Sequence, residues 1–225
     1  MRSALDNVAH DLRTPLTRLR GSAELALGAE PNLELYRDAL ADCVEESDQL
    51  LTMLNTLMDI SEAETGTLAL ALEPVDIAAL VEDAIDLYRE VAEEKAIVLA
   101  MSVPTDLWVR ADRNRLRQVV ANLLDNAIKY TPRGGRVDCV VSQEETQVVL
   151  VVKDTGTGIA AEELPKIWER LYRGDHSRTH RGLGLGLSLV RAVVHAHQGV
   201  IDVSSVRGVG SRFTVTLPLT SGRNG

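Results

Sequence analysis

The spacing of apolar residues changes once along this chain, between Ser61 and Thr67. Before this stretch, apolar residues recur alternately four and three positions apart, which is the heptad pattern of helices that pack in bundles. After it, Gly66 marks a linker, and valine-rich strands alternate with amphipathic helices. The change of period predicts an α+β protein of two domains, a helical one over residues 1–64 and an α/β one over residues 68–219.

The helical part contains two heptad segments separated by a turn at Gly28–Asn32. Two antiparallel helices cannot bury both apolar stripes by themselves, so we expect the hairpin to form a homodimer, a four-helix bundle. The first stripe consists of Leu5, Ala9, Leu12, Leu16, Leu19, Ala23 and Ala26, and the second of Tyr36, Leu40, Cys43, Ser47, Leu50, Leu54 and Leu57.

A histidine and a carboxylate lie side by side on the flank of the first helix, outside its stripe, as His10 and Asp11. Thr14 follows four residues after His10 and shares its face of the helix. Imidazole is well suited to act as a nucleophile near neutral pH. Pro15 cannot donate a hydrogen bond to the Asp11 carbonyl, so we expect the helix to bend or loosen after His10. This segment alone leaves two interpretations of His10 equally open, a nucleophile or a solvated surface residue.

The composition excludes some classes of function. The net charge of −9 and an aromatic content of 3% argue against nucleic acid as a partner, because nucleic-acid binders carry a basic face and aromatic stacking platforms. Cys43 and Cys139 lack metal-ligand spacing and are expected to be reduced thiols of a cytosolic protein. The helical pattern starts almost at Met1, so we expect the chain to be part of a longer protein.

The second part is predicted to be a two-layer α/β sandwich of mostly antiparallel strands covered by helices. The predicted strands are Leu68–Leu72, Ile97–Val103, Leu107–Arg110, Val137–Ser142, Val148–Lys153, Val200–Ser205 and Phe213–Leu217. The predicted helices are Ile77–Glu94, Asp112–Tyr130 and Leu185–His197.

The second of these helices carries two asparagines, Asn122 and Asn126, four residues apart on one face. Their amide oxygens could bind a hydrated Mg²⁺ or a phosphate, and Lys129 adds a positive charge nearby. Two solvated asparagines are the alternative, although asparagine is a mediocre helix former in a leucine-rich helix.

Two glycine-rich segments follow. Asp154-Thr155-Gly156-Thr157-Gly158-Ile159 comes directly after a strand, where a carboxylate could accept a hydrogen bond from an exocyclic amine such as that of adenine. Gly182-Leu183-Gly184-Leu185-Gly186-Leu187 leads into an apolar helix, and backbone N–H groups at such a junction can hold phosphate oxygens. The alternative for the first segment is an ordinary turn, and the alternative for the second is a flexible linker.

Taken in order, these motifs resemble those of the catalytic core of bacterial sensor histidine kinases. His10–Leu16 is similar to the H box of that family, Asn122–Tyr130 to its N box, Asp154–Ile159 to its first glycine box and Gly182–Leu187 to its second. Trp168–Arg173 is similar to the F box, with tryptophan where phenylalanine is usual. The resemblance implies a dimerisation and histidine-phosphotransfer hairpin followed by a Bergerat-type ATP-binding domain.

The resemblance also implies roles for individual residues, with ATP and Mg²⁺ as cofactors. His10 would be the phosphoacceptor, Asn126 the principal Mg²⁺ ligand, and Asp154 the partner of the adenine amino group. Asn122 and Lys129 would contact phosphate, and Tyr130 would flank the adenine. The other residues expected at the nucleotide site are Gly156, Gly158, Ile159, Arg170, Gly182, Gly184, Leu185 and Gly186. The loop from Tyr172 to Arg181 would be the ATP lid.

By the same resemblance, the expected activity is autophosphorylation of His10 and phosphoryl transfer to an aspartate of a response-regulator receiver domain. Asp11 would hold the imidazole, and Thr14 would orient a water for dephosphorylating the regulator; a hydroxyl bonded to the His10 carbonyl is the alternative for Thr14. The parent protein is expected in the cell membrane with this part in the cytoplasm. Arg181 and Leu183 depart from the glycine and threonine that usually open the second glycine box.

Two other functions stay open at this point. A related ATPase, of the gyrase, heat-shock chaperone or mismatch-repair type, would hydrolyse ATP without His10, but such proteins lack the heptad hairpin. A non-enzymatic dimeric scaffold would neither bind nucleotide nor become phosphorylated.

Overall fold

The computed structural model describes residues 2–30, 32–174 and 184–219, with side chains from residue 12 onward. The chain divides into two compact units, Met1–Asp59 with Arg170–Leu185, and Ile60–Glu169 with Gly186–Gly225. The predicted α+β class, a helical hairpin followed by a two-layer α/β part, is confirmed. The domain boundaries at residues 64 and 68 stay predictions. In the described part of the chain, no helix is long and apolar enough to cross a membrane.

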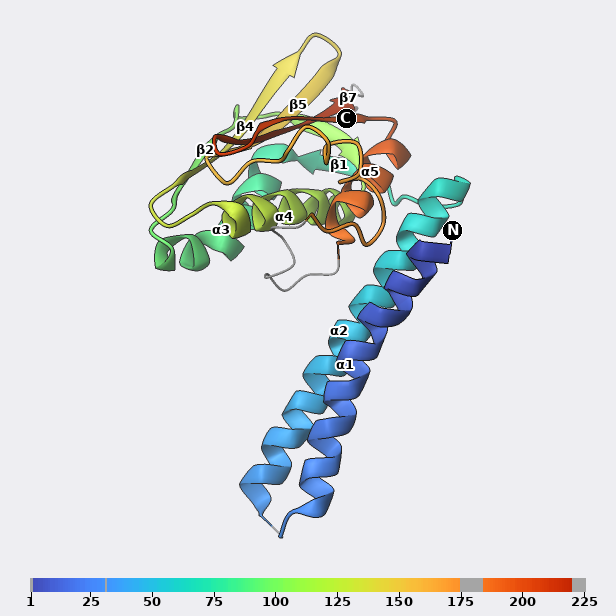
Figure 1. The fold of residues 1–225 in the computed structure, drawn as a ribbon. Helices are drawn as coiled ribbons and strands as arrows, with labels where there is room; N and C mark the ends of the chain where they lie inside the picture. The colour runs from blue at the N-terminus through green and yellow to red at the C-terminus, as the bar shows by residue number, and fades with distance from the viewer. Residues whose placement is uncertain (1, 31, 175–183, 220–225) are drawn as a thin grey trace. The chain divides into compact units, whose positions relative to one another are not determined.

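The hairpin consists of α1 (Arg2–Gly28) and α2 (Leu33–Thr65), which lie side by side (Figure 1). Asn32 begins α2, because its Oδ1 accepts hydrogen bonds from the N–H groups of Glu34 (3.0 Å) and Leu35 (3.3 Å). The loosening expected after His10 does not interrupt α1, which continues through Pro15 as one helix.

The apolar stripes of the hairpin are only partly buried. Ala39 and Met53 are 8% and 1% exposed, whereas the predicted stripe residues Leu40 and Leu54 are 65% and 46% exposed. An apolar row at heptad spacing therefore remains uncovered on α2, which we term the open row. It consists of Leu40, Val44, Leu51, Leu54 and Met58.

The second unit is built on a five-stranded sheet in the order β2-β4-β5-β7-β6. Only β2 and β4 pair in parallel; the other neighbours are antiparallel, and β7 lies inside the sheet between β5 and β6. The strands are β2 (Val98–Ser102), β4 (Arg136–Glu144), β5 (Gln147–Asp154), β6 (Val200–Val206) and β7 (Gly210–Pro218).

The strand predicted at Leu68–Leu72 is wrong. This segment has no regular structure, and the first strand is β1 (Glu73–Asp76), which pairs with β3 (Trp108–Ala111) in a separate two-stranded sheet. The backbone N–H of Ala71 donates to the Asp112 carboxylate at 3.1 Å instead of to a strand. A strand needs a partner, and the residues that pair with β3 begin at Glu73, five residues after the predicted start at Leu68.

Three helices cover one face of the large sheet, namely α3 (Ile77–Glu94), α4 (Arg113–Tyr130) and α5 (Gly186–Ala196) (Figure 1). Each agrees closely with a predicted helix. The N-caps follow from the sequence, since Asp76 and Asp112 accept hydrogen bonds from the first N–H groups of α3 and α4. Cys139 is fully buried in this core, and its burial raises the thiol pKa to about 12.

Candidate nucleotide and phosphotransfer sites

Both asparagines of the N box lie half-buried on the same side of α4, while the leucines and valines of this helix fill the core. The Asn122 Nδ2 donates to the Gln118 carbonyl at 2.8 Å, which fixes the amide. Its Oδ1 would be only 2.7 Å from a Cβ at Gly186, and the Asn126 Nδ2 would be 3.9 Å from the same Cβ. The two amides therefore face the first residue of α5, and glycine there allows the Asn122 amide to approach this helix closely.

Lys129 and Tyr130 end α4. The Lys129 Nζ lies 5.4 Å from the centre of the Tyr130 ring. The Tyr130 carbonyl accepts a hydrogen bond from the Thr157 N–H at 3.1 Å, which ties the N box to the first glycine box. The Nζ of Lys95 donates to the carbonyls of Ile128 (2.9 Å) and Lys129 (3.3 Å) and so holds the end of the helix.

Asp154 is the last residue of β5 and is 6% exposed. Its Oδ1 accepts hydrogen bonds from the N–H groups of Gly156 (2.8 Å) and Ser211 (3.2 Å). Burial raises the pKa of Asp154 above its ordinary value, while the hydrogen bonds from Gly156 and Ser211 lower it. The result is a shielded carboxyl group at a strand end, held by two segments of the chain.

The glycines of the first glycine box are required by contacts within the chain itself. A Cβ at Gly156 would lie 2.6 Å from the Tyr130 carbonyl oxygen and 2.7 Å from the Asp154 Oδ1. Gly158 has φ +63° and would meet the backbone of Val206. Ile159 is half-buried, and its N–H donates to the Ser205 Oγ at 2.8 Å. This loop therefore packs closely on the backbone of Tyr130 and of Val206.

The second glycine box is described in part. Gly182 lies outside the described residues, as do Arg181 and Leu183. Gly184 has φ +67°, and a Cβ there would lie 2.6 Å from the Tyr172 carbonyl oxygen. The Leu171 N–H donates to the Gly184 carbonyl at 3.0 Å. Two further residues that the sequence predicts at the nucleotide site lie within the described part of the chain: Arg170 is half-buried and Leu185 is buried.

The predicted phosphoacceptor lies on α1. The backbone of His10 and Asp11 is helical, and their side chains lie outside the described residues. Thr14 is exposed on the same helix, four residues after His10.

Sequence reasoning missed Ser205, Ser211 and Lys95, all of which contact the predicted site residues or their neighbours. Ser211 is 57 positions from Asp154, and Ser205 is 46 positions from Ile159, so no local motif joins them. A weak signal was present, because both serines occupy inward-facing positions of their strands, on the same face as Ile201 and Phe213.

Two family models match the chain. The His Kinase A (phospho-acceptor) domain matches residues 1–66, and the Histidine kinase-, DNA gyrase B-, and HSP90-like ATPase matches residues 111–221. Among solved structures, the mycobacterial sensor histidine kinase MprB is 32% identical with a TM-score of 0.61, covering 65% of this chain and 98% of the MprB chain. The chain belongs to the sensor histidine kinase family. Its ATP-binding part therefore contains α4, the first glycine box and α5.

This histidine kinase core covers only part of the length of its curated relatives. The Sensor histidine kinase WalK of Bacillus subtilis (strain 168) is 34% identical over 223 residues, which are 96% of this chain and 36% of WalK. The chain thus spans about a third of the length of that relative. The fold is also shared with histidine kinase ThkA, solved in complex with response regulator protein TrrA, at 24% identity and a TM-score of 0.70, covering 98% of this chain and 62% of ThkA.

Proposed function

We propose that this chain transfers the γ-phosphoryl group of ATP to His10 and then to an aspartate of a response-regulator receiver domain. The observation that carries the proposal is the close approach of the Asn122 amide to Gly186, where an amide oxygen faces the N-terminus of α5. Backbone N–H groups at a helix N-terminus favour anions such as the phosphates of ATP. The proposed working parts are the hairpin over residues 1–64 and the nucleotide domain over residues 68–219.

The nucleotide roles follow the chemistry of each group. Asp154, ionised, accepts a hydrogen bond from the adenine amino group, and Tyr130 flanks the ring. Lys129 and Asn122 contact phosphate oxygens. The glycines Gly156, Gly158, Gly182, Gly184 and Gly186, with Ile159, Leu185 and Arg170, form the walls and the phosphate-binding loop of the site.

Mg²⁺ fits this donor set as an ion held mainly by phosphate and water. The described residues contain no cluster of three or more histidine, cysteine or acidic side chains that could cage a metal. Mg²⁺ keeps several waters and takes one or two protein oxygens beside substrate phosphates, which the Asn126 amide can provide. When bound, the ion neutralises phosphate charge. Removing it with EDTA should abolish phosphorylation, and Asn126→Ala should raise the Mg²⁺ concentration needed.

The proposed transfer is an in-line displacement at phosphorus. Asp11 accepts a hydrogen bond from the His10 Nδ1–H, which leaves Nε2 unprotonated with its lone pair free. Nε2 forms the new P–N bond while the bond from the γ-phosphorus to the bridging oxygen breaks, and ADP leaves with that electron pair. The P–N bond of the product is labile, and an aspartate carboxylate of the regulator displaces the histidine in the same manner.

The open row supports a homodimer through the hairpin, because it leaves five large apolar side chains of α2 uncovered. The receiver domain is the second proposed partner; the solved complex of ThkA with a response regulator supports it. We further propose that the parent protein is longer and anchored in the cell membrane with this core in the cytoplasm. Fractionation of cells that produce the full-length protein tests this.

A regulator phosphatase activity is proposed for Thr14, whose hydroxyl would orient the attacking water. Thr14→Ala should keep autophosphorylation and lose most dephosphorylation of the regulator, whereas Thr17→Ala, three residues further along α1, should affect neither activity. Undiminished phosphatase activity in Thr14→Ala would contradict this role.

Incubation with γ-labelled ATP tests the main proposal. The native chain should acquire label that is stable in base and labile in acid, and His10→Gln should acquire none. ATP hydrolysis that persists in His10→Gln without labelling of the native chain would favour an ATPase of the gyrase type. Absence of both nucleotide binding and labelling would favour a scaffold.

A further inference from the structure

Three hydroxyl and carboxyl groups form a continuous hydrogen-bonded chain behind the first glycine box. The Ile159 N–H donates to the Ser205 Oγ at 2.8 Å. The single Ser205 hydroxyl proton is shared between the Gly210 carbonyl, 2.8 Å from the Ser205 Oγ, and the Ser211 Oγ, 3.1 Å from it. The chain ends at Asp154, which accepts hydrogen bonds from both the backbone and the side chain of Ser211. All its members lie in one compact unit.

The direction of each hydrogen bond is determined by proton counting. A serine hydroxyl has a single proton, and a buried carboxylate can only accept. The proton of Ser211 is therefore directed to Asp154, and the Ser211 oxygen accepts the longer branch of the hydrogen bond that Ser205 shares with the Gly210 carbonyl. The Ser205 oxygen is held in turn by the Ile159 N–H. Ser205 thus fixes which way the Ser211 hydroxyl points.

We propose that Ser205 is a positioning residue for nucleotide recognition, which orients the Ser211 hydroxyl toward Asp154 and keeps that carboxylate ready to accept the adenine amino group. This inference rests on the proposed function for the part that concerns adenine. The relay from Ser205 to Asp154 itself belongs to the nucleotide-free chain.

The relay has a large effect because Asp154 is shielded. Asp154 and Ser211 are 6% and 8% exposed, so water cannot easily replace a lost hydrogen bond. The charged side chains on the elements packed against this end of β5 include Lys129 on α4, Arg136 and Asp138 on β4, and Arg212 on β7. The shift of the Asp154 pKa arises from burial and from the hydrogen bonds of Gly156 and Ser211 rather than from these charges.

The first experiment is a carbon-13 NMR titration of the Asp154 carboxyl in the nucleotide-free full chain. Ser205→Ala should raise the Asp154 pKa by about one unit, because one charge-assisted hydrogen bond is weakened. Ser205→Thr keeps the hydroxyl and should restore the native value. Ser204→Ala is the matched control, because Ser204 is exposed on the opposite face of β6 and its loss should leave the titration unchanged.

A double-variant cycle separates the relay from a purely structural role. Ser211→Ala should raise the Asp154 pKa by itself, and adding Ser205→Ala to it should give no further rise, since the relay is already broken. Additive shifts in the double variant, or an unchanged Asp154 pKa in Ser205→Ala, would overturn the proposal. If Ser205→Ala does not fold, native titration in the Ser211→Ala chain would overturn it as well.

The second experiment measures the Kd for ADP and GDP by calorimetry as a function of pH. The Ser205→Ala chain should bind ADP about tenfold more weakly and should lose part of its preference for ADP over GDP. As the pH is lowered, it should lose its affinity for ADP at a higher pH than the native chain does. Native affinity with a native pH profile would contradict the role in recognition. Failure of the native chain to bind ADP would instead contradict the proposed function, and the NMR titration would still decide the relay.

Discussion

At the scale of single residues, His197 is a buried base held between two backbone groups. Its Nε2 accepts from the Asp112 N–H at 3.0 Å, and its Nδ1 lies 2.8 Å from the Val193 carbonyl, so the ring is neutral with its proton on Nδ1. Burial lowers the pKa of His197, and Val193 and Asp112 oppose that shift only in part. A protonated ring would direct a second N–H at the Asp112 N–H.

This lowered pKa predicts a pH dependence of stability. The unfolded chain takes up the proton near pH 6.5, before the folded chain does, so the free energy of unfolding falls as pH drops below about 6.5 and stops falling below the folded pKa. His197→Gln should lower Tm at pH 7 and reduce the slope of Tm between about pH 7 and pH 5. His195→Gln, at an exposed position, is the control. An unchanged slope in His197→Gln would show that other groups cause the acid sensitivity.

A second prediction at this scale concerns Gly186. An alanine Cβ would lie 2.7 Å from the Asn122 Oδ1, so the amide must move and its bond to Gln118 must weaken. Gly186→Ala should reduce ATP affinity at least about tenfold in calorimetry while Tm falls little, because alanine is the better helix former. Gly21→Ala, where a Cβ meets nothing within 4 Å, should keep native affinity. Equal ATP affinity in the two variants would argue against a phosphate site here.

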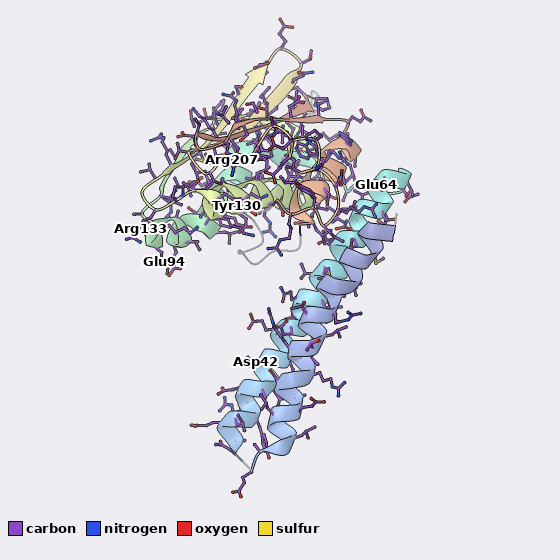
Figure 2. The ribbon with its side chains drawn as sticks, in the orientation of Figure 1. Asp42, Glu64, Glu94, Tyr130, Arg133 and Arg207 are labelled. Atoms are coloured by element: carbon purple, nitrogen blue, oxygen red, sulfur yellow. The ribbon has the colours of Figure 1, made fainter. Side chains whose placement is uncertain are left out.

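At the scale of secondary-structure elements, the ends of α3 and α4 are joined through one lysine and its neighbours. Lys95 follows α3, and its Nζ donates to the last carbonyls of α4, while the Arg133 side chain returns to the Glu94 carbonyl at 2.8 Å. Glu94 and Arg133 lie together at this end of the unit, with Tyr130 at the end of α4 (Figure 2). A cation at a helix C-terminus also interacts favourably with the helix dipole.

Lys95→Met should therefore destabilise the α/β unit by about 1–2 kcal/mol and weaken ATP binding, because Lys129 and Tyr130 lose their support. Lys95→Arg should recover most of both, and Lys166→Met, at an exposed position, should change neither. Thermal unfolding and calorimetry measure the two effects. A fall in Tm without any change in ATP affinity would limit Lys95 to a structural role.

At the scale of the whole molecule, the open row determines the expected state of assembly. Leu40 on α2 and Leu87 on α3 are both 65% exposed, but only Leu40 belongs to a row of apolar residues at heptad spacing. Leu40→Glu should convert the dimer to a monomer in light scattering, and Leu87→Glu should leave the dimer intact. A dimer that survives Leu40→Glu, or is lost in Leu87→Glu, would place the interface elsewhere.

Structural features that depend on residues close together in the sequence could be predicted from the sequence alone. Helix α3 has the predicted bounds because its apolar period and the Asp76 cap are local, and Asp154 and Gly156 follow β5 as expected. The prediction of a strand at Leu68–Leu72 failed because the position of this strand is set by its pairing with β3, some forty residues away in the sequence. Ser205 and Ser211 could not be predicted as part of the site, since their contacts with Ile159 and Asp154 exist only once the sheet has formed.

The position of β7 inside the sheet has a consequence for biosynthesis. Residues 210–218 leave the ribosome after every other strand of the sheet, yet β7 supplies the partner of both β5 and β6. Until it pairs, β5 has an unpaired edge and Asp154 lacks the Ser211 hydrogen bonds. A nascent chain should therefore be unable to bind ATP before its last strand emerges, and until then the edge of β5 is a target for chaperones or for aggregation.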